Sequence, residues 1–268
     1  MLELEHEFRV VDVHTRFEPD PERRPRDAPD PDGLEREMHQ AGIVRSLVFP
    51  AARQDGYLAA NNAVARLCVD RSLVPIARLD GARRPGDGPL DRAVNAGRRV
   101  TGGGTPPEDV EQYAYDDRFE GFKLDPGVDG LPAPAVLDRL ESVGLPVIVH
   151  GGRRFPPDRI AATLLDRSMP VIVAHFGGYP LDDALTHEAI DLLGSYDDCY
   201  LDTSFVRFRD PLERAIMEHP GQILFGSGAP MAHPNVAIME ILTLDVPEDA
   251  MRRVFSTNPG RVFESLAP

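Results

Sequence analysis

Short apolar runs recur along the 268-residue chain, and segments with helical spacing of apolar residues separate them. Runs that are apolar throughout and rich in β-branched residues are typical of strands buried on both faces of a parallel sheet. The eight runs are Val10–His14, Val44–Phe49, Leu73–Leu79, Gly121–Leu124, Pro146–His150, Pro170–His175, Cys199–Thr203 and Ile223–Gly226.

Helical patterns fill most of the intervals between these runs. A glycine follows two of them, Gly42 and Gly144, at the position where glycine commonly ends a helix. The expected helices are Asp32–Gln40, Tyr57–Arg71, Leu90–Val100, Ala133–Val143, Asp158–Asp166, Leu181–Leu193, Pro211–Glu218 and Asn235–Leu244.

This alternation predicts a (β/α)8 TIM barrel with a closed, parallel sheet, formed by one domain that spans residues 1–268. The alternative is an open, doubly wound sheet. A glycine-rich dinucleotide fingerprint after an early strand would favour that alternative, and the sequence has none. The third unit is the least regular, with a Pro/Gly loop at Gly81–Pro89 and a flexible glycine-rich loop at Thr101–Pro107. Pro19–Pro31 is predicted to be either a lid or a disordered loop.

Composition narrows the possible partners and location. The net charge is −15, from 44 acidic and 29 basic residues, which argues against nucleic acid and anionic membranes as partners. No apolar run approaches the roughly 20 residues of a membrane span. Cys68 and Cys199 form no motif and the N-terminus is acidic, so a cytoplasmic location is expected. An Asp-rich chain whose single lysine is Lys123 indicates either a salt-adapted, halophilic source or a coding bias.

The residues that could carry chemistry stand where the predicted strands end. In a TIM barrel these carboxyl ends surround the active site. The motifs are Asp12-Val13-His14-Thr15-Arg16, Gly121-Phe122-Lys123-Leu124-Asp125-Pro126, His150-Gly151-Gly152, His175-Phe176-Gly177-Gly178, Leu201-Asp202-Thr203-Ser204 and Phe225-Gly226-Ser227-Gly228-Ala229-Pro230.

In this order, the motifs resemble those of the amidohydrolase-related family, which includes metal-dependent hydrolases and carboxymuconate-semialdehyde-type decarboxylases. The resemblance implies metal ligands at both histidines of Asp-x-His-x-His, at a histidine on the fifth strand and at an aspartate on the eighth, and a histidine on the sixth strand that is either catalytic or a ligand. His14, His150 and His175 match these positions. Arg16 replaces the second histidine, and Gly228 replaces the aspartate.

The two replacements change the chemistry that the site can perform. A guanidinium cannot ligate a metal ion, glycine offers no side-chain donor, and zinc usually needs at least three protein ligands. We therefore expect no cofactor, with His14, His150 and His175 as vestiges of a lost metal site. Arg16 instead offers a planar fork that suits a carboxylate.

The expected site combines acid–base and anion-binding groups. His175 is the expected general acid or base, because an imidazole titrates near neutral pH. Lys123 either binds a substrate carboxylate, acts as a nucleophile, or forms a structural ion pair with Asp125 or Asp12. The expected catalytic residues are His175, Lys123 and His150, and the expected substrate-binding residues are His14, Arg16, Arg153, Arg154 and Asp202.

Other loop arginines leave two interpretations open. Arg53, Arg207 and Arg209 follow predicted strands, and either widen a cationic mouth or stand there by chance. His233 is the remaining candidate for a replacement ligand, although a surface position is the simpler interpretation.

Two functions remain from these observations. The first is a divergent amidohydrolase-type hydrolase or decarboxylase that acts on a small anionic, carboxylated compound. The alternative is a non-catalytic barrel that binds a ligand or a protein partner. A homo-oligomer is compatible with either.

We predict that the purified protein holds no tightly bound metal, because Arg16 and Gly228 stand at two ligand positions. Elemental analysis after purification without added metal should find zinc far below one equivalent. About one equivalent of zinc that resists dialysis would contradict this prediction and would require other ligands.

Overall fold

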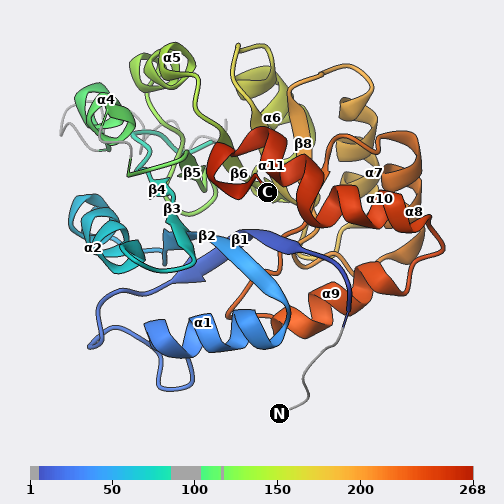
Figure 1. Ribbon diagram of the computed structural model, residues 1–268. Coiled ribbons are helices and arrows are strands. Elements are labelled where there is room, and N and C mark those ends of the chain that lie inside the picture. Colours follow the sequence, from blue (N-terminus) through green and yellow to red (C-terminus); the bar gives the residue numbers. More distant parts are fainter. Residues whose placement is uncertain (1–5, 86–103, 116–117, 268) are drawn as a thin grey trace.

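The computed structural model describes residues 6–85, 104–115 and 118–267, and Figure 1 shows helices placed around a set of parallel strands. The strands are β1 (Val10–Phe17), β2 (Ile43–Pro50), β3 (Leu73–Pro75), β4 (Ala77–Arg78), β5 (Phe122–Leu124), β6 (Val147–Gly152), β7 (Val171–Tyr179), β8 (Cys199–Asp202) and β9 (Ile223–Leu224). The helices are α1 (Pro31–Gln40), α2 (Leu58–Cys68), α4 (Pro107–Tyr115), α5 (Pro134–Val143), α6 (Pro157–Ile160), α7 (Asp183–Leu193), α8 (Arg209–Glu218), α9 (Pro234–Leu242), α10 (Glu248–Arg252) and α11 (Asn258–Val262).

The strands pair in sequence order and form two parallel sheets. One sheet has the order β1-β2-β3 and the other the order β4-β5-β6-β7-β8-β9, all parallel. Ile76, between β3 and β4, donates its N–H to Val48 O at 2.9 Å and joins the two sheets. Val13 N donates to Phe225 O at 2.9 Å, and Gly228 N donates to His14 O at 3.0 Å. The predicted TIM barrel is confirmed, although its strands pair as two sheets that single backbone hydrogen bonds link, and not as the one closed sheet that was expected.

Successive side chains along the strands point alternately into the barrel and toward the surrounding helices. Ile148 of β6 and Ile172 of β7 belong to the inner apolar cluster, whereas Val147, Val149, Val171 and Val173 pack against the helices. Both faces of the strands are thus buried, which explains why the runs show no polar alternation. Arg9, just before β1, donates to Leu266 O at 3.0 Å, so the C-terminal segment covers the amino ends of the strands.

Several helices differ from the sequence-based expectation. Helix α1 begins at Pro31, where Asp30 accepts a hydrogen bond from Gly33 N at 2.7 Å and caps the helix. Helix α4 was not predicted, because only Val110 and Tyr113 form its buried stripe and nine residues give a weak periodic signal. The short helices α10 and α11 were also missed. The expected helix Leu90–Val100 lies outside the described residues.

The loop that follows β1 is tied to the loop after β2. Arg23 forms a bidentate pair with Asp55, with its shorter contact at 2.7 Å, and Arg53 Nη2 contacts Glu18 Oε1 at 2.5 Å. These contacts hold residues 18–30 beside the carboxyl ends of the strands. Within the described ranges, no helix has the length and apolar character needed to cross a membrane.

Asp12 joins the first and last strands. Its side chain is fully buried and accepts hydrogen bonds from His14 N at 2.9 Å, from Ser227 N at 2.9 Å and from Thr15 Oγ1 at 2.8 Å. The Ser227 hydroxyl is a further donor. A buried carboxylate is tolerated when its oxygens are satisfied in this way.

We predict that Asp12→Ala lowers the free energy of unfolding by about 3–5 kcal/mol, because it removes a charged acceptor and leaves several buried donors unpaired. Urea denaturation monitored by circular dichroism measures the change. Asp27→Ala, at an exposed position in the loop after β1, should stay within about 0.5 kcal/mol of the wild type. Equal losses in the two variants would contradict a closing role for Asp12.

Candidate active site

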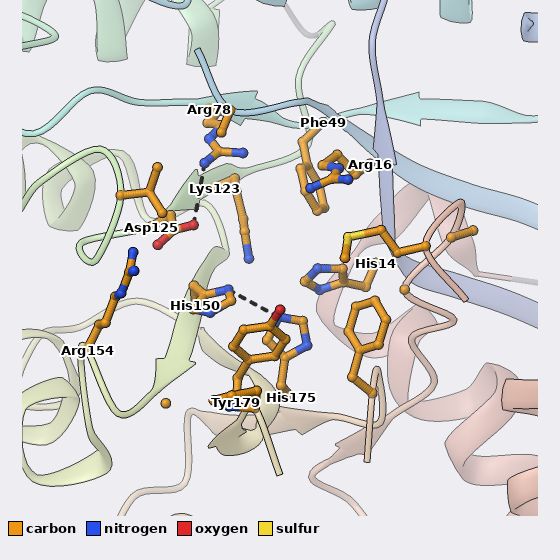
Figure 2. A pocket seen from close by; sticks show the side chains of 18 of the residues that line it. His14, Arg16, Phe49, Arg78, Lys123, Asp125, His150, Arg154, His175 and Tyr179 are labelled. Carbon is orange, nitrogen blue, oxygen red and sulfur yellow. Dashed lines mark hydrogen bonds and ion pairs between the residues drawn. The ribbon is translucent and has the colours of Figure 1, made fainter. Parts of the chain in front are cut away.

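A cavity of about 510 Å³ opens at the carboxyl ends of the strands, the expected position of a barrel active site. Figure 2 shows histidine, lysine and arginine side chains from different strands pointing into it. Of the residues predicted for the site, seven line the cavity: His14, Arg16, Lys123, His150, Arg153, Arg154 and His175. Asp202 does not line it and lies buried behind the histidines.

Simple alternation brings Lys123 and Arg78 into the barrel. Phe122 and Leu124 pack against the helices, so Lys123 between them faces inward. Arg78, the last residue of β4, lies in the same way between Ala77 and Leu79, which pack against the helices. The sequence analysis missed Arg78, although its position near the end of the run Leu73–Leu79 was the available signal.

His14 and His175 reach the cavity through local irregularities. The pairing of β1 with β2 shifts register between Asp12 and Thr15, around His14, and bulges of this kind redirect side chains. In β7, Ala174 faces inward, so regular alternation would turn His175 outward. His175 instead has φ of 60°, in the left-handed region, and this local strain is typical of functional sites.

Asp202 organises the polar side of the cavity. Its Oδ2 accepts from His14 Nδ1 at 2.7 Å, and its Oδ1 accepts from His175 N at 3.1 Å and from Ser204 N at 3.0 Å. The Ser204 hydroxyl also donates to Oδ1. Burial raises the pKa of Asp202, but the electrostatic interaction and hydrogen bond with the His14 imidazole outweigh this and hold the pKa well below its ordinary value.

The ionised carboxylate fixes the direction of a hydrogen-bond chain. Because Ser204 Oγ donates to Asp202, it accepts from His175 Nδ1 at 2.7 Å, and Ser204 O accepts from the same nitrogen at 3.2 Å. His175 Nε2 must then accept, so His150 Nδ1 donates to it at 3.1 Å. His175 thus has both ring nitrogens engaged. Within the described part of the chain, His14 Nε2 and His150 Nε2 hold no hydrogen bond.

The three imidazoles are neutral at pH 7. Burial lowers the pKa of His14, and Asp202 opposes part of this shift while Lys123 adds to it. Burial, with help from Lys123 and His14, lowers the pKa of His150 to about 4. The pKa of His175 falls well below its ordinary value through burial and the two neighbouring imidazoles. These groups therefore present unprotonated nitrogens.

Two cations of the cavity lack partners. Lys123 Nζ is buried and has no hydrogen bond or ion pair with any described residue, and it lies over the Phe49 ring, 5.1 Å from the ring centroid. The alternative of an ion pair with Asp125 or Asp12 is therefore wrong. The Arg16 guanidinium is half-buried and also has no ion pair or hydrogen bond among the described residues. Arg78, in contrast, contacts Asp129 at 2.8 Å.

The remaining arginines contribute unequally. Arg153 lies at the rim, where its Nε contacts Asp182 at 2.8 Å, and Arg154 donates to Gly127 O at 3.4 Å. Arg207 and Arg209 pair with Glu240 and Glu213 and do not line this cavity, so they are not part of a cationic mouth. His233 is exposed and caps α9.

Aromatic residues that the sequence analysis did not single out also line the cavity. They are Phe49, Tyr179 and Phe205.

The donor set does not fit the metal that the resemblance implies. The described residues contain no group of three or more His, Cys, Asp or Glu side chains arranged to hold a metal ion. His175 has no free ring nitrogen to offer. Gly228 has φ of 74°, and a Cβ there would stand 2.8 Å from the Phe205 ring. An aspartate at 228 therefore requires Phe205 to move.

Fold and cavity together define a TIM-barrel protein with a histidine-lined, cationic pocket. A family model described as Amidohydrolase matches residues 11–264, and the chain belongs to this family. No curated protein matches the chain.

Solved structures with related folds cover nearly the whole chain. An uncharacterised TIM-barrel protein from Bordetella bronchiseptica is 21% identical, with a TM-score of 0.64, over 96% of this chain and 99% of its own. 2,6-Dihydroxybenzoate decarboxylase from Rhizobium is 17% identical, with a TM-score of 0.64 and the same coverage. A probable 2-pyrone-4,6-dicarboxylic acid hydrolase from Acinetobacter baumannii is 16% identical, with a TM-score of 0.63, over 95% of this chain and 99% of its own. At these identities, the likeness establishes the fold.

We predict that stability falls as pH falls from about 6.5 to about 4, because the unfolded chain protonates its histidines at about pH 6.5 whereas His150 resists protonation until about pH 4. The slope from His150 reaches about 1.4 kcal/mol per pH unit. Urea denaturation over this range should give a shallower slope for His150→Gln than for the wild type. His39→Gln, at an exposed position on α1, should keep the wild-type slope, and equal slopes in all three proteins would refute the assignment.

Proposed function

We propose that the chain is an amidohydrolase-family enzyme that binds a small carboxylated compound without a metal bridge and converts it by acid–base chemistry. One observation carries this proposal. The unpaired cations of Arg16 and Lys123 share one 510 Å³ cavity with two buried imidazoles, His14 and His175, and the half-buried imidazole of His150. A buried cation without a counterion is costly, so the cavity favours an anionic occupant.

The occupant's chemistry follows from the lining. Arg16 offers a planar pair of donors for a carboxylate, and Lys123 adds a point charge deeper in the cavity. Phe49, Tyr179 and Phe205 provide faces for an unsaturated or ring-shaped body. Two structural neighbours support this assignment: one is a decarboxylase complexed with 2,6-dihydroxybenzoate, and the other is the probable 2-pyrone-4,6-dicarboxylic acid hydrolase, which has citric acid bound.

Proton transfer is best assigned to His14. Its Nε2 is free, and the Asp202 carboxylate bonded to Nδ1 stabilises the imidazolium that forms when His14 accepts a proton. His150 offers a second free nitrogen, but its pKa of about 4 makes it the weaker base. His175, expected from the sequence to be the acid or base, instead orients His150 through Nε2. Asp202 acts as a positioning residue and not as a direct substrate ligand.

The reaction is either hydrolysis or carbon–carbon bond cleavage with loss of CO₂. Assays with a panel of hydroxybenzoates, a pyrone dicarboxylate and small oxo carboxylates, each monitored for CO₂ and for proton release, separate the two. Turnover by the wild type that is lost in His14→Gln, while binding is retained, would support an enzymatic function with His14 as the acid–base residue. Tight binding of a panel member without turnover of any compound would identify a non-catalytic barrel instead. The net charge of −15 argues against nucleic-acid and anionic-membrane partners, and the two isolated cysteines favour a cytoplasmic setting.

We predict that Arg16→Ala weakens binding of a small carboxylate by about 1.5–3 kcal/mol, the range for a hydrogen bond to a charged group. Isothermal titration calorimetry with 2,6-dihydroxybenzoate and with citrate measures the change, in metal-free buffer containing a chelator. Arg252→Ala, on the exposed face of α10, should bind as the wild type does. Wild-type affinity in Arg16→Ala, or no binding of either anion to the wild type, would overturn the anion site.

A further inference from the structure

We propose that Lys123 is a nucleophile that forms an imine with the ketone carbon of a small 3-oxo carboxylate bound in the cavity. The inference deepens the proposed function, because it names the substrate class and the group that activates it. It rests on the carboxylate-binding cavity described above and on the position of Lys123 within it.

The environment of Lys123 is that of a nucleophile and not of a structural cation. Its Nζ is buried, lines the cavity and has no hydrogen bond or ion pair with a described residue. Figure 2 shows the side chain reaching from β5 into the space between His14 and His150. A structural lysine at this depth would be expected to hold a carboxylate, and Asp129 instead bonds to Arg78.

A nucleophilic lysine must be partly unprotonated near neutral pH. Burial lowers the pKa of Lys123 to about 8, with Arg78 adding to this shift and Asp202 and Asp125 opposing it. The free amine is therefore present at a useful fraction at pH 7. The titratable and charged groups that surround it are His14 from β1, Arg78 from β4, Asp125 and Asp129 after β5, His150 from β6, His175 from β7 and Asp202 from β8.

The chemistry balances with water and a proton as the other participants. The Nζ lone pair attacks the ketone carbon, the C–N bond forms, and the oxygen is protonated and leaves as water. The resulting iminium accepts the electron pair of the bond to the carboxylate carbon, which releases CO₂ and forms an enamine. Protonation of the enamine carbon and addition of water then release the ketone and restore the amine.

The position of the ketone decides the substrate class. In a 3-oxo carboxylate, the electrons left by CO₂ flow into the C=N⁺ bond one carbon away. A 2-oxo carboxylate would leave them on the imine carbon itself, where the same iminium cannot accept them. The free nitrogens of His14 and His150 beside the amine serve the proton transfers, and Phe49 offers the departing CO₂ an apolar surface.

The composition of the chain makes the test direct. Lys123 is the only lysine, so an amine adduct can form only there or at the α-amino group. Wild-type protein incubated with acetoacetate and sodium cyanoborohydride should gain the mass of a reduced adduct, which peptide mapping places on Lys123. An adduct whose mass lacks the carboxyl group would show that CO₂ leaves before the imine is reduced. Trapping should increase as pH rises through about 8.

Lys123→Arg retains the cation and removes the nucleophile. This variant should form no reduced adduct at position 123 and should release no CO₂ from acetoacetate. It should still bind citrate in calorimetry. Lys123→Met serves as a second variant if the arginine does not fit, and Arg252→Ala should trap as the wild type does. Citrate binding by the wild type without any adduct on Lys123 would overturn the imine and leave the proposed anion site intact. Loss of both would overturn the proposed function as well.

Discussion

The buried carboxylate of Asp202 is the constraint on which the polar site depends. An isolated carboxylate in the barrel interior would be strongly destabilising, so it must collect hydrogen bonds. It does so from His14 Nδ1 and from the backbone and hydroxyl of Ser204, with His175 N as a further donor. The contacts that compensate the charge are the same ones that orient two of the three imidazoles. Stability and site geometry are therefore coupled at this residue.

From this coupling the electrostatic character of the cavity follows. The hydrogen-bond chain from His150 through His175 and Ser204 to Asp202 fixes which ring nitrogens carry protons, and burial keeps the rings neutral. With the imidazoles neutral, Arg16 and Lys123 are cavity cations that no described carboxylate pairs with. On a protein with a net charge of −15, the proposed binding of small anions would therefore depend on these cations inside the cavity and not on the overall field.

Two positions of the site bear on the metal ligands that the resemblance implies. Arg16 places a fixed positive charge at one position where the resemblance implies a metal ligand. At the other, Gly228 has a left-handed backbone and the Phe205 ring occupies the space of its missing side chain. The proposed carboxylate site agrees with both positions, since an aromatic wall and a guanidinium suit an organic carboxylate better than they suit a metal ion.

The sequence by itself determined the barrel, because strands buried on both faces must be apolar throughout and their order is fixed by the chain. It also identified His14, Lys123, His150 and His175 at strand ends, where barrel geometry brings them together. Only the tertiary structure decided how they interact. The bulge at His14 and the left-handed φ of His175 arise from packing between distant strands, so local periodicity cannot report them. The lack of an ion pair at Lys123 was likewise decided by the tertiary structure. Asp129 pairs with Arg78, which stands 45 positions before Lys123 in the sequence, and Asp12 accepts a hydrogen bond from Ser227.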